Sequence, residues 1–211
     1  MEQLVKVWLG GEGPSEIGDR DRREGERVGA LEALLRKVEA EGWRVAGAVR
    51  WQRIRKFVVG AARGRDNHGD IHSIAGLLNM AYEAGCEVVV FSRDVDAERE
   101  RADAIARGIE LSRAIDHLRH LGVVGGPAVP ALEGWILALR GVRDTEMMSR
   151  QKANALLDEA GLGGKHAEDY VRVIKEADLG RLPPGCDELR RWIERARGVM
   201  AKVIRGGAGG R

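Results

Sequence analysis

Two short motifs in this sequence place acidic side chains directly after an apolar run. The first, "VKVWLGGEGPSEIG", carries Glu12 and Glu16 on a glycine-rich turn, and the second, "VVVFSRDVDAE", carries Asp94 and Asp96. Unpaired carboxylates about 4 Å apart repel by roughly 4 kcal/mol per pair at an effective dielectric of 20, so a convergent group of them requires a cation. Oxygen ligands favour Mg²⁺ or Mn²⁺, which could polarise a phosphodiester and activate a water molecule.

The two motifs can share a cation only if the strands that precede them are neighbours. In open α/β sheets, ligand sites lie outside the carboxyl ends of the strands, where the strand order reverses. We therefore expect Glu12 to meet Asp94 and Asp96 at this edge of one sheet. Residues two apart in an extended segment point the same way, so the two aspartates could hold one ion or flank two. The glycines beside Glu12 permit a sharp turn and leave room for a phosphate.

The rest of the chain supplies the elements of such a sheet. Apolar residues three and four apart predict helices, whereas the run "CEVVVFS" is typical of a parallel strand buried on both faces. The predicted strands are 4–9, 43–51, 86–92 and 121–129, and the predicted helices are 26–41, 70–84 with Asp70 as N-cap, 97–119, and one that begins near Leu132. Segment 54–60 could add a hairpin or a further strand. This alternation predicts an α/β fold with a Rossmann-like parallel sheet of about four strands, flanked by helices.

Beyond about residue 145 the pattern is helical only. Three further helices are expected, within 149–161, 166–177 and 186–204. The domain organisation that follows is an α/β domain over 1–145, a helical extension packed on it over 146–205, and a flexible tail over 206–211.

The composition excludes several classes of protein. The 35 basic residues nearly balance the 33 acidic ones, and a net charge of +2 gives no global field toward nucleic acid, so such a role would need a local patch. No apolar run approaches the roughly 20 residues that span a bilayer, so no membrane partner is expected. The chain shows no signal-peptide pattern, and Cys86 and Cys186 form no disulfide or metal motif, which predicts a cytoplasmic location.

A hydrophobic strand that ends in "GEGPSE", followed about eighty residues later by one that ends in "DVD", resembles the TOPRIM domain of topoisomerases, DnaG-type primases and OLD-family nucleases. The resemblance covers roughly residues 3–130 and implies an acidic Mg²⁺ site. In it, Glu12 matches the turn glutamate, and Asp94 and Asp96 match the D-x-D pair. Glu16 matches the second acidic position of nuclease-type members. The "LGG" before Glu12 and the lack of a third aspartate favour the small nuclease-like members, several of which occur in bacterial phage-defence and mobile-element systems.

Two residues from the second half of the chain are candidates for the same site. "VPALEGWILAL" resembles the E-x-W segment of small bacterial TOPRIM-like proteins, which implies that Glu133 reaches the metal from a helix start, where the helix dipole favours its charge. Lys165 follows a glycine-rich turn and is similar in place to a lysine that stabilises phosphate charge in OLD-family nucleases. Simpler interpretations stay open: Glu133 as a helix N-terminal charge, Glu16 as a surface acid, and Asp94 with Asp96 as N-cap and first-turn acid of a helix.

A basic stretch lies close to the predicted acidic edge and is a candidate for binding the phosphates of nucleic acid. Its members are Arg53, Arg55, Lys56, Arg63, Arg65 and His68. Arginine is frequent throughout this chain, so the stretch also fits an ordinary solvated surface. The spacing of His68 and His72 could suggest a pair of metal ligands, but their place at the junction between a loop and the helix predicted at 70–84 favours a capping role.

Taken together, the motifs predict a nuclease or related phosphoryl-transfer enzyme that uses Mg²⁺ or Mn²⁺ and acts on DNA or RNA. One alternative is a non-catalytic binding or regulatory subunit that keeps the fold and works with a partner ATPase or as a homo-oligomer. Another is a phosphatase of the haloacid dehalogenase type, in which the first aspartate of D-x-D is the nucleophile. That motif normally follows the first strand, whereas here it follows a later one and leaves Glu12 unexplained.

Overall fold

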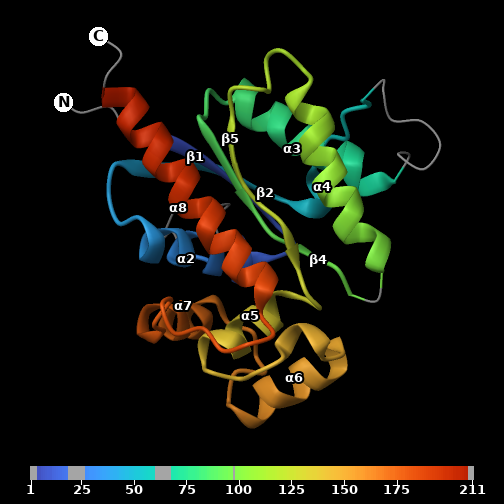
Figure 1. The fold of residues 1–211 in the computed structure, drawn as a ribbon, viewed down its shortest axis with the longest axis vertical. Coiled ribbons are helices and arrows are strands. Elements are labelled where there is room, and N and C mark those ends of the chain that lie inside the picture. The colour runs from blue at the N-terminus through green and yellow to red at the C-terminus, as the bar shows by residue number, and fades with distance from the viewer. Residues whose placement is uncertain (1–3, 19–26, 60–67, 97, 209–211) are drawn as a thin grey trace.

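The architecture is an α/β fold around a four-stranded parallel sheet, as the sequence predicts. The computed structural model describes residues 4–18, 27–59, 68–96 and 98–208. The sheet has strand order β2-β1-β3-β5 (Figure 1). Its strands are β1 (Val5–Gly11), β2 (Trp43–Arg50), β3 (Val88–Phe91) and β5 (Gly122–Val124). A short separate parallel pair consists of β4 (Arg93–Asp94) and β6 (Pro127–Ala128).

Strands β1 and β3 form the centre of the sheet because their apolar side chains are covered on both faces. All four residues of β3 are buried, as are Val7 and Leu9 of β1. The parallel register places Leu9 beside Val90 and Gly10 beside Phe91. Since the two strands end at the same level, the turn after β1 and the segment after β3 lie next to each other at the carboxyl edge of the sheet.

Helices cover both faces of this sheet. Helices α2 (Ala30–Val38) and α8 (Asp187–Ala208) pack on one face, and α3 (Gly69–Glu83) and α4 (Arg99–Arg113) pack on the other (Figure 1). Helix α8 is fixed to the sheet by Trp192, whose buried indole donates a 3.0 Å hydrogen bond to the Phe91 carbonyl at the end of β3. A donor and an acceptor that would otherwise be buried without partners are thereby satisfied.

Shorter helices cluster beyond the carboxyl edge. They are α1 (Pro14–Ile17), α5 (Leu132–Leu139), α6 (Arg150–Glu159) and α7 (Ala167–Glu176), with single 3₁₀ turns at Trp51–Arg53 and Thr145–Met147. The helices expected after residue 145 are therefore present, as α6, α7 and α8. Their apolar side chains share one hydrophobic core with β1, β3 and α2, and the rings of Trp135 on α5 and Trp192 on α8 lie 5.9 Å apart. The boundary drawn at residue 145 stays a prediction.

Several predicted elements are shorter than expected or divided. Helix α2 is shorter than the predicted 26–41, because Glu39 is extended, with φ of −142°. Residues 54–59 form no strand. The strand predicted at 121–129 divides into β5 and β6 at two glycines, where the pairing partner changes from β3 to β4. Gly125 packs so closely on the Phe91 ring that a Cβ there would lie 1.9 Å from a ring atom.

The start of α3 also differs from the prediction that Asp70 is its N-cap. His68 holds the N-cap position, and its Nδ1 accepts a 3.1 Å hydrogen bond from the Asp70 backbone N–H. Asp70 thus lies inside the first turn, where its side chain is buried and free to bind other groups. Helix α4 ends at Arg113, several residues before the predicted end at 119. Among the described residues, no helix combines the length and apolar character needed to cross a membrane.

Candidate metal centre

The turn after β1 is built around the buried carboxyl group of Glu16. Its Oε2 accepts hydrogen bonds from the Glu12 backbone N–H at 2.8 Å and from the Ser92 hydroxyl at 3.2 Å, so it ties the β1 turn to the end of β3. Gly11 is required beside it, because a Cβ at this position would lie 2.6 Å from Glu16 Oε2. Burial raises the pKa of Glu16 well above its ordinary value, and the charge of Asp94 raises it further.

Asp94 lies under the start of α5 and is only 3% exposed. Its Oδ1 accepts a 3.0 Å hydrogen bond from the backbone N–H of Leu132, the first residue of α5. The pKa of Asp94 is raised to about 7, chiefly by burial and further by the carboxylates of Glu12 and Glu133. Three acids from three separate elements therefore act on one another electrostatically at this point of the sheet edge.

The second aspartate of D-x-D does not continue the extended strand. Asp96 has a left-handed backbone, with φ of 52°, so the simple alternation of side chains expected for an extended segment does not hold. Arg150 nevertheless binds both carboxylates from the start of α6. Its Nη2 lies 3.3 Å from Asp94 Oδ2, and its Nη1 lies 2.5 Å from Asp96 Oδ1. The two aspartates thus flank one cationic group.

Glu133 joins the cluster from the first turn of α5, as the resemblance implies. It is 6% exposed, and its Oε1 lies 2.5 Å from Lys165 Nζ. Its Oε2 is buried and has no hydrogen-bond partner within the described part of the chain, and the same holds for the Tyr170 hydroxyl of α7. Burial raises the pKa of Tyr170, and Glu133, Asp94 and Glu16 raise it further, so this hydroxyl remains a neutral potential donor.

Sequence reasoning missed the residues that surround these acids with positive charge. Arg93 pairs with Glu12 through Nη1, while its Nε lies 3.1 Å from Asp70 Oδ1. Arg101 Nε lies 3.0 Å from Asp70 Oδ2, and its Nη1 donates a 3.0 Å hydrogen bond to the Asp94 carbonyl. Asp70 resembles a helix cap in the sequence, and only the tertiary contacts of α3 show that it anchors Arg93 of β4 and Arg101 of α4.

The predicted phosphate-binding residues separate into different environments. Lys56 and His68 line a cavity of about 330 Å³ next to Arg93. Arg55 Nη2 lies 2.5 Å from Glu83 and is not among the residues that line this cavity, and neither is Arg53. Two further candidates, Arg63 and Arg65, lie outside the described residues.

The chemistry of the acids fits a hard divalent cation. One oxygen of Glu133 is buried and has no partner within the described part of the chain, and burial and neighbouring acids raise the pKa of Asp94 to about 7. A bound cation would give the Glu133 oxygen a partner and lower the pKa of Asp94. In the described ranges, no group of three or more His, Cys, Asp or Glu side chains is arranged to hold a metal ion. Positive side chains stand against the carboxylates instead: Arg93 on Glu12, Arg150 on the two aspartates and Lys165 on Glu133.

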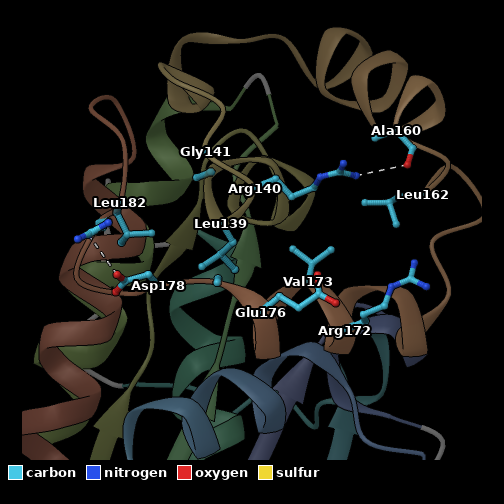
Figure 2. Close-up of a pocket in the computed structure, with 13 residues that line it drawn as sticks. Leu139, Arg140, Gly141, Ala160, Leu162, Arg172, Val173, Glu176, Asp178 and Leu182 are labelled. Atoms are coloured by element: carbon cyan, nitrogen blue, oxygen red, sulfur yellow. Dashed lines mark hydrogen bonds and ion pairs between the residues drawn. The ribbon is translucent and has the colours of Figure 1, made fainter.

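A larger cavity, of about 570 Å³, lies at the opposite end of α5 and is distinct from this cluster. Figure 2 shows Arg140 and Arg172 beside its apolar side chains Leu139 and Val173. Arg140 donates a 3.3 Å hydrogen bond to the Ala160 carbonyl. None of the candidate acids lines this cavity, so it is not part of the candidate metal centre.

Comparisons of the chain with protein-family models, with characterised proteins and with solved structures found no match. Any functional assignment therefore depends on the residues gathered at the carboxyl edge.

Proposed function

We propose that the protein is a TOPRIM-like, divalent-metal-dependent phosphodiesterase that cuts nucleic acid, in the manner of the small nucleases of bacterial phage-defence and mobile-element systems. The observation that carries the proposal is the environment of Asp94. Its carboxyl group is buried, and its pKa is raised by burial and by Glu12 and Glu133, while one oxygen of Glu133 has no partner among the described residues. A gathered set of carboxylates with a raised pKa, and with an oxygen left without a partner among the described residues, is typical of a site that receives a cation.

Glu12, Asp94 and Asp96 would hold Mg²⁺ or Mn²⁺, and Glu133 would complete the ligand set. When bound, the cation would polarise the scissile phosphodiester and lower the pKa of a water molecule. Glu16 acts as a positioning residue, because its carboxyl group holds the Glu12 backbone against Ser92.

Basic residues next to the ligands are suited to bind the negative charge that develops on the phosphate. Arg93 and Arg150 already touch the carboxylates, and each carries a permanent positive charge on a planar group that suits phosphate oxygens. Lys165 contacts the acidic cluster by an ion pair between its Nζ and the carboxylate of Glu133. Charge stabilisation by such preorganised groups is commonly the largest contribution to catalysis of this kind.

The decisive experiment is a cleavage assay on labelled single- and double-stranded DNA and RNA, with Mg²⁺ or Mn²⁺ and with EDTA. Metal-dependent cleavage that falls by a factor of about 10² or more in Asp94→Ala is expected, as for loss of one strong electrostatic group. Asp103→Asn, which alters an exposed acid on α4, is the matched control. No cleavage by the parent protein, or equal cleavage by Asp94→Ala, would overturn the proposal.

A second candidate function is a non-catalytic TOPRIM-like subunit that works with a partner such as an ATPase. The ion pairs favour it, because Arg93, Arg150 and Lys165 already neutralise the carboxylates without a metal. Titration with Mn²⁺ separates the two candidates, since a purely structural ion-pair network binds no metal. The phosphatase alternative requires an accessible aspartate nucleophile, whereas Asp94 is buried beneath the Leu132 N–H and Arg150.

A further inference from the structure

The polar cavity lined by Lys56 and His68 lies directly beside the candidate metal centre. Its volume is about 330 Å³, and Trp51, Lys56, His68, Asp70, Arg93 and Arg101 are among the residues that line it. Arg93 belongs to both sites, because its Nη1 pairs with Glu12 and its Nε binds Asp70 on the cavity wall. One guanidinium group therefore separates the cavity from the carboxylates.

Asp70, the one acid among the described residues that line this cavity, already has several donors bound to it. Asp70 accepts hydrogen bonds from Trp51 Nε1 at 3.2 Å, from Arg93 Nε at 3.1 Å and from Arg101 Nε at 3.0 Å. A buried carboxylate with this many donors holds both arginines in fixed positions and has little remaining capacity to repel an anion. Asp70 thus preorganises the cavity instead of cancelling its positive charge.

Lys56, His68 and Arg93 offer donors to this cavity, which Gln52 and Ser73 also line. Lys56 makes no ion pair with any described residue, although it lies on the cavity wall. The His68 ring accepts a hydrogen bond through Nδ1, which leaves its Nε2 as the N–H donor in the neutral ring. Arg93 uses Nε and Nη1 for carboxylates, and its Nη2 makes no hydrogen bond within the described ranges. These groups are the kind that bind phosphate oxygens.

We infer that this cavity is a phosphate subsite that binds a backbone phosphate of a nucleic-acid strand next to the phosphate at the metal centre. The inference rests on the proposed function, because a polynucleotide is the substrate that presents a second phosphate beside the one being cut. Contacts of this kind fix the register of a strand without reading its sequence. The strand then runs from the start of α3, past Arg93, to the acids at the ends of β1 and β4.

The inference is tested by binding of a short fluorescein-labelled single-stranded oligonucleotide in EDTA, followed by fluorescence anisotropy at several salt concentrations. Lys56→Gln is expected to weaken binding about three- to tenfold and to lower the slope of log K against log salt by about 1. Lys56→Arg, which keeps the charge, should restore most of the affinity. Lys202→Gln, at an exposed position on α8, is the matched control and should bind like the parent.

The outcomes separate this inference from the proposed function because the assay needs no metal and no cleavage. A parent protein that binds no oligonucleotide, or equal affinity in Lys56→Gln and the parent, would show that the cavity is not a phosphate subsite. An equal loss in Lys202→Gln would show that only overall charge matters and would also overturn it. Weaker binding in Lys56→Gln alone, in a protein that never cuts nucleic acid, would support the subsite and refute the nuclease.

Discussion

The guanidinium group of Arg150 lies 3.3 Å from Asp94 Oδ2. The same group pairs with Asp96 at 2.5 Å, so one side chain from α6 neutralises both aspartates of the D-x-D motif. Arg150 is part-exposed, at 42%, whereas Asp94 is almost fully buried. The Arg150 side chain can therefore move away from the D-x-D motif without disrupting the core.

We predict that Arg150→Gln binds Mn²⁺ up to about fivefold more tightly than the parent. The variant removes a positive charge that competes with the metal, and a part-exposed ion pair contributes up to about 1 kcal/mol. Isothermal titration calorimetry measures the affinity. Lys152→Gln, two residues along α6 and exposed, should bind Mn²⁺ like the parent. Weaker binding in Arg150→Gln would mean that Arg150 supports the site and does not compete with the ion.

Replacement of Asp94 by Asn should stabilise the metal-free protein at pH 8. A carboxyl group whose folded pKa is raised contributes stability that is fully present below its unfolded pKa, about 3.9, and that is lost as the pH rises through its folded value. For Asp94 that value is about 7, so the parent should lose stability between about pH 4 and 7. Urea unfolding across this range should show the advantage of Asp94→Asn growing with pH. An advantage that does not change with pH would contradict the raised pKa.

Glu16 should tolerate a neutral side chain of the same shape. Gln can accept the same two hydrogen bonds from the Glu12 N–H and the Ser92 hydroxyl, and it carries no charge to bury. Glu16→Gln should therefore unfold at pH 8 with a free energy at least equal to that of the parent. Glu16→Ala should lose about 2–3 kcal/mol, through the lost hydrogen bonds and the cavity left behind. Equal stability of both variants would show that the hydrogen bonds of Glu16 are dispensable.

Asp70 should be the most sensitive acid for stability. Asp70→Ala leaves Arg93 and Arg101 without their shared carboxylate in a part-buried position, and the loss of one partner from a buried ion pair costs about 3–5 kcal/mol. Chemical denaturation measures the loss, with Asp103→Ala on α4 as the exposed control. A change below about 1 kcal/mol in Asp70→Ala would mean that the two arginines are solvated well enough without it.

Much of the fold could be predicted because its signals are local. The apolar runs of β1 and β3 and the periodic helices are visible in the sequence, and their alternation predicts the parallel sheet. Boundaries were less predictable. Helix α2 ends at Val38, before its predicted end, and the break between β5 and β6 coincides with a tertiary contact, the close packing of Gly125 on Phe91.

The acids of the candidate site could be predicted, but the network around them could not. Placing Glu12 beside Asp94 requires only the parallel order of two strands. The pairing of Arg150 with Asp94, or of Arg93 with Asp70, joins residues more than twenty positions apart, and no motif in the sequence links the two partners. The role of Glu16 also becomes visible only when its burial and its bonds to Glu12 and Ser92 are known.

The most direct test of the metal centre is an anomalous difference map from crystals soaked in Mn²⁺. One or two strong peaks are expected within coordination distance of Glu12, Asp94 and Asp96, with Arg150 turned away from the aspartates. A map without a peak at these carboxylates, at Mn²⁺ concentrations that saturate ordinary metalloenzymes and with Arg150 still paired to Asp94, would contradict the proposed metal centre.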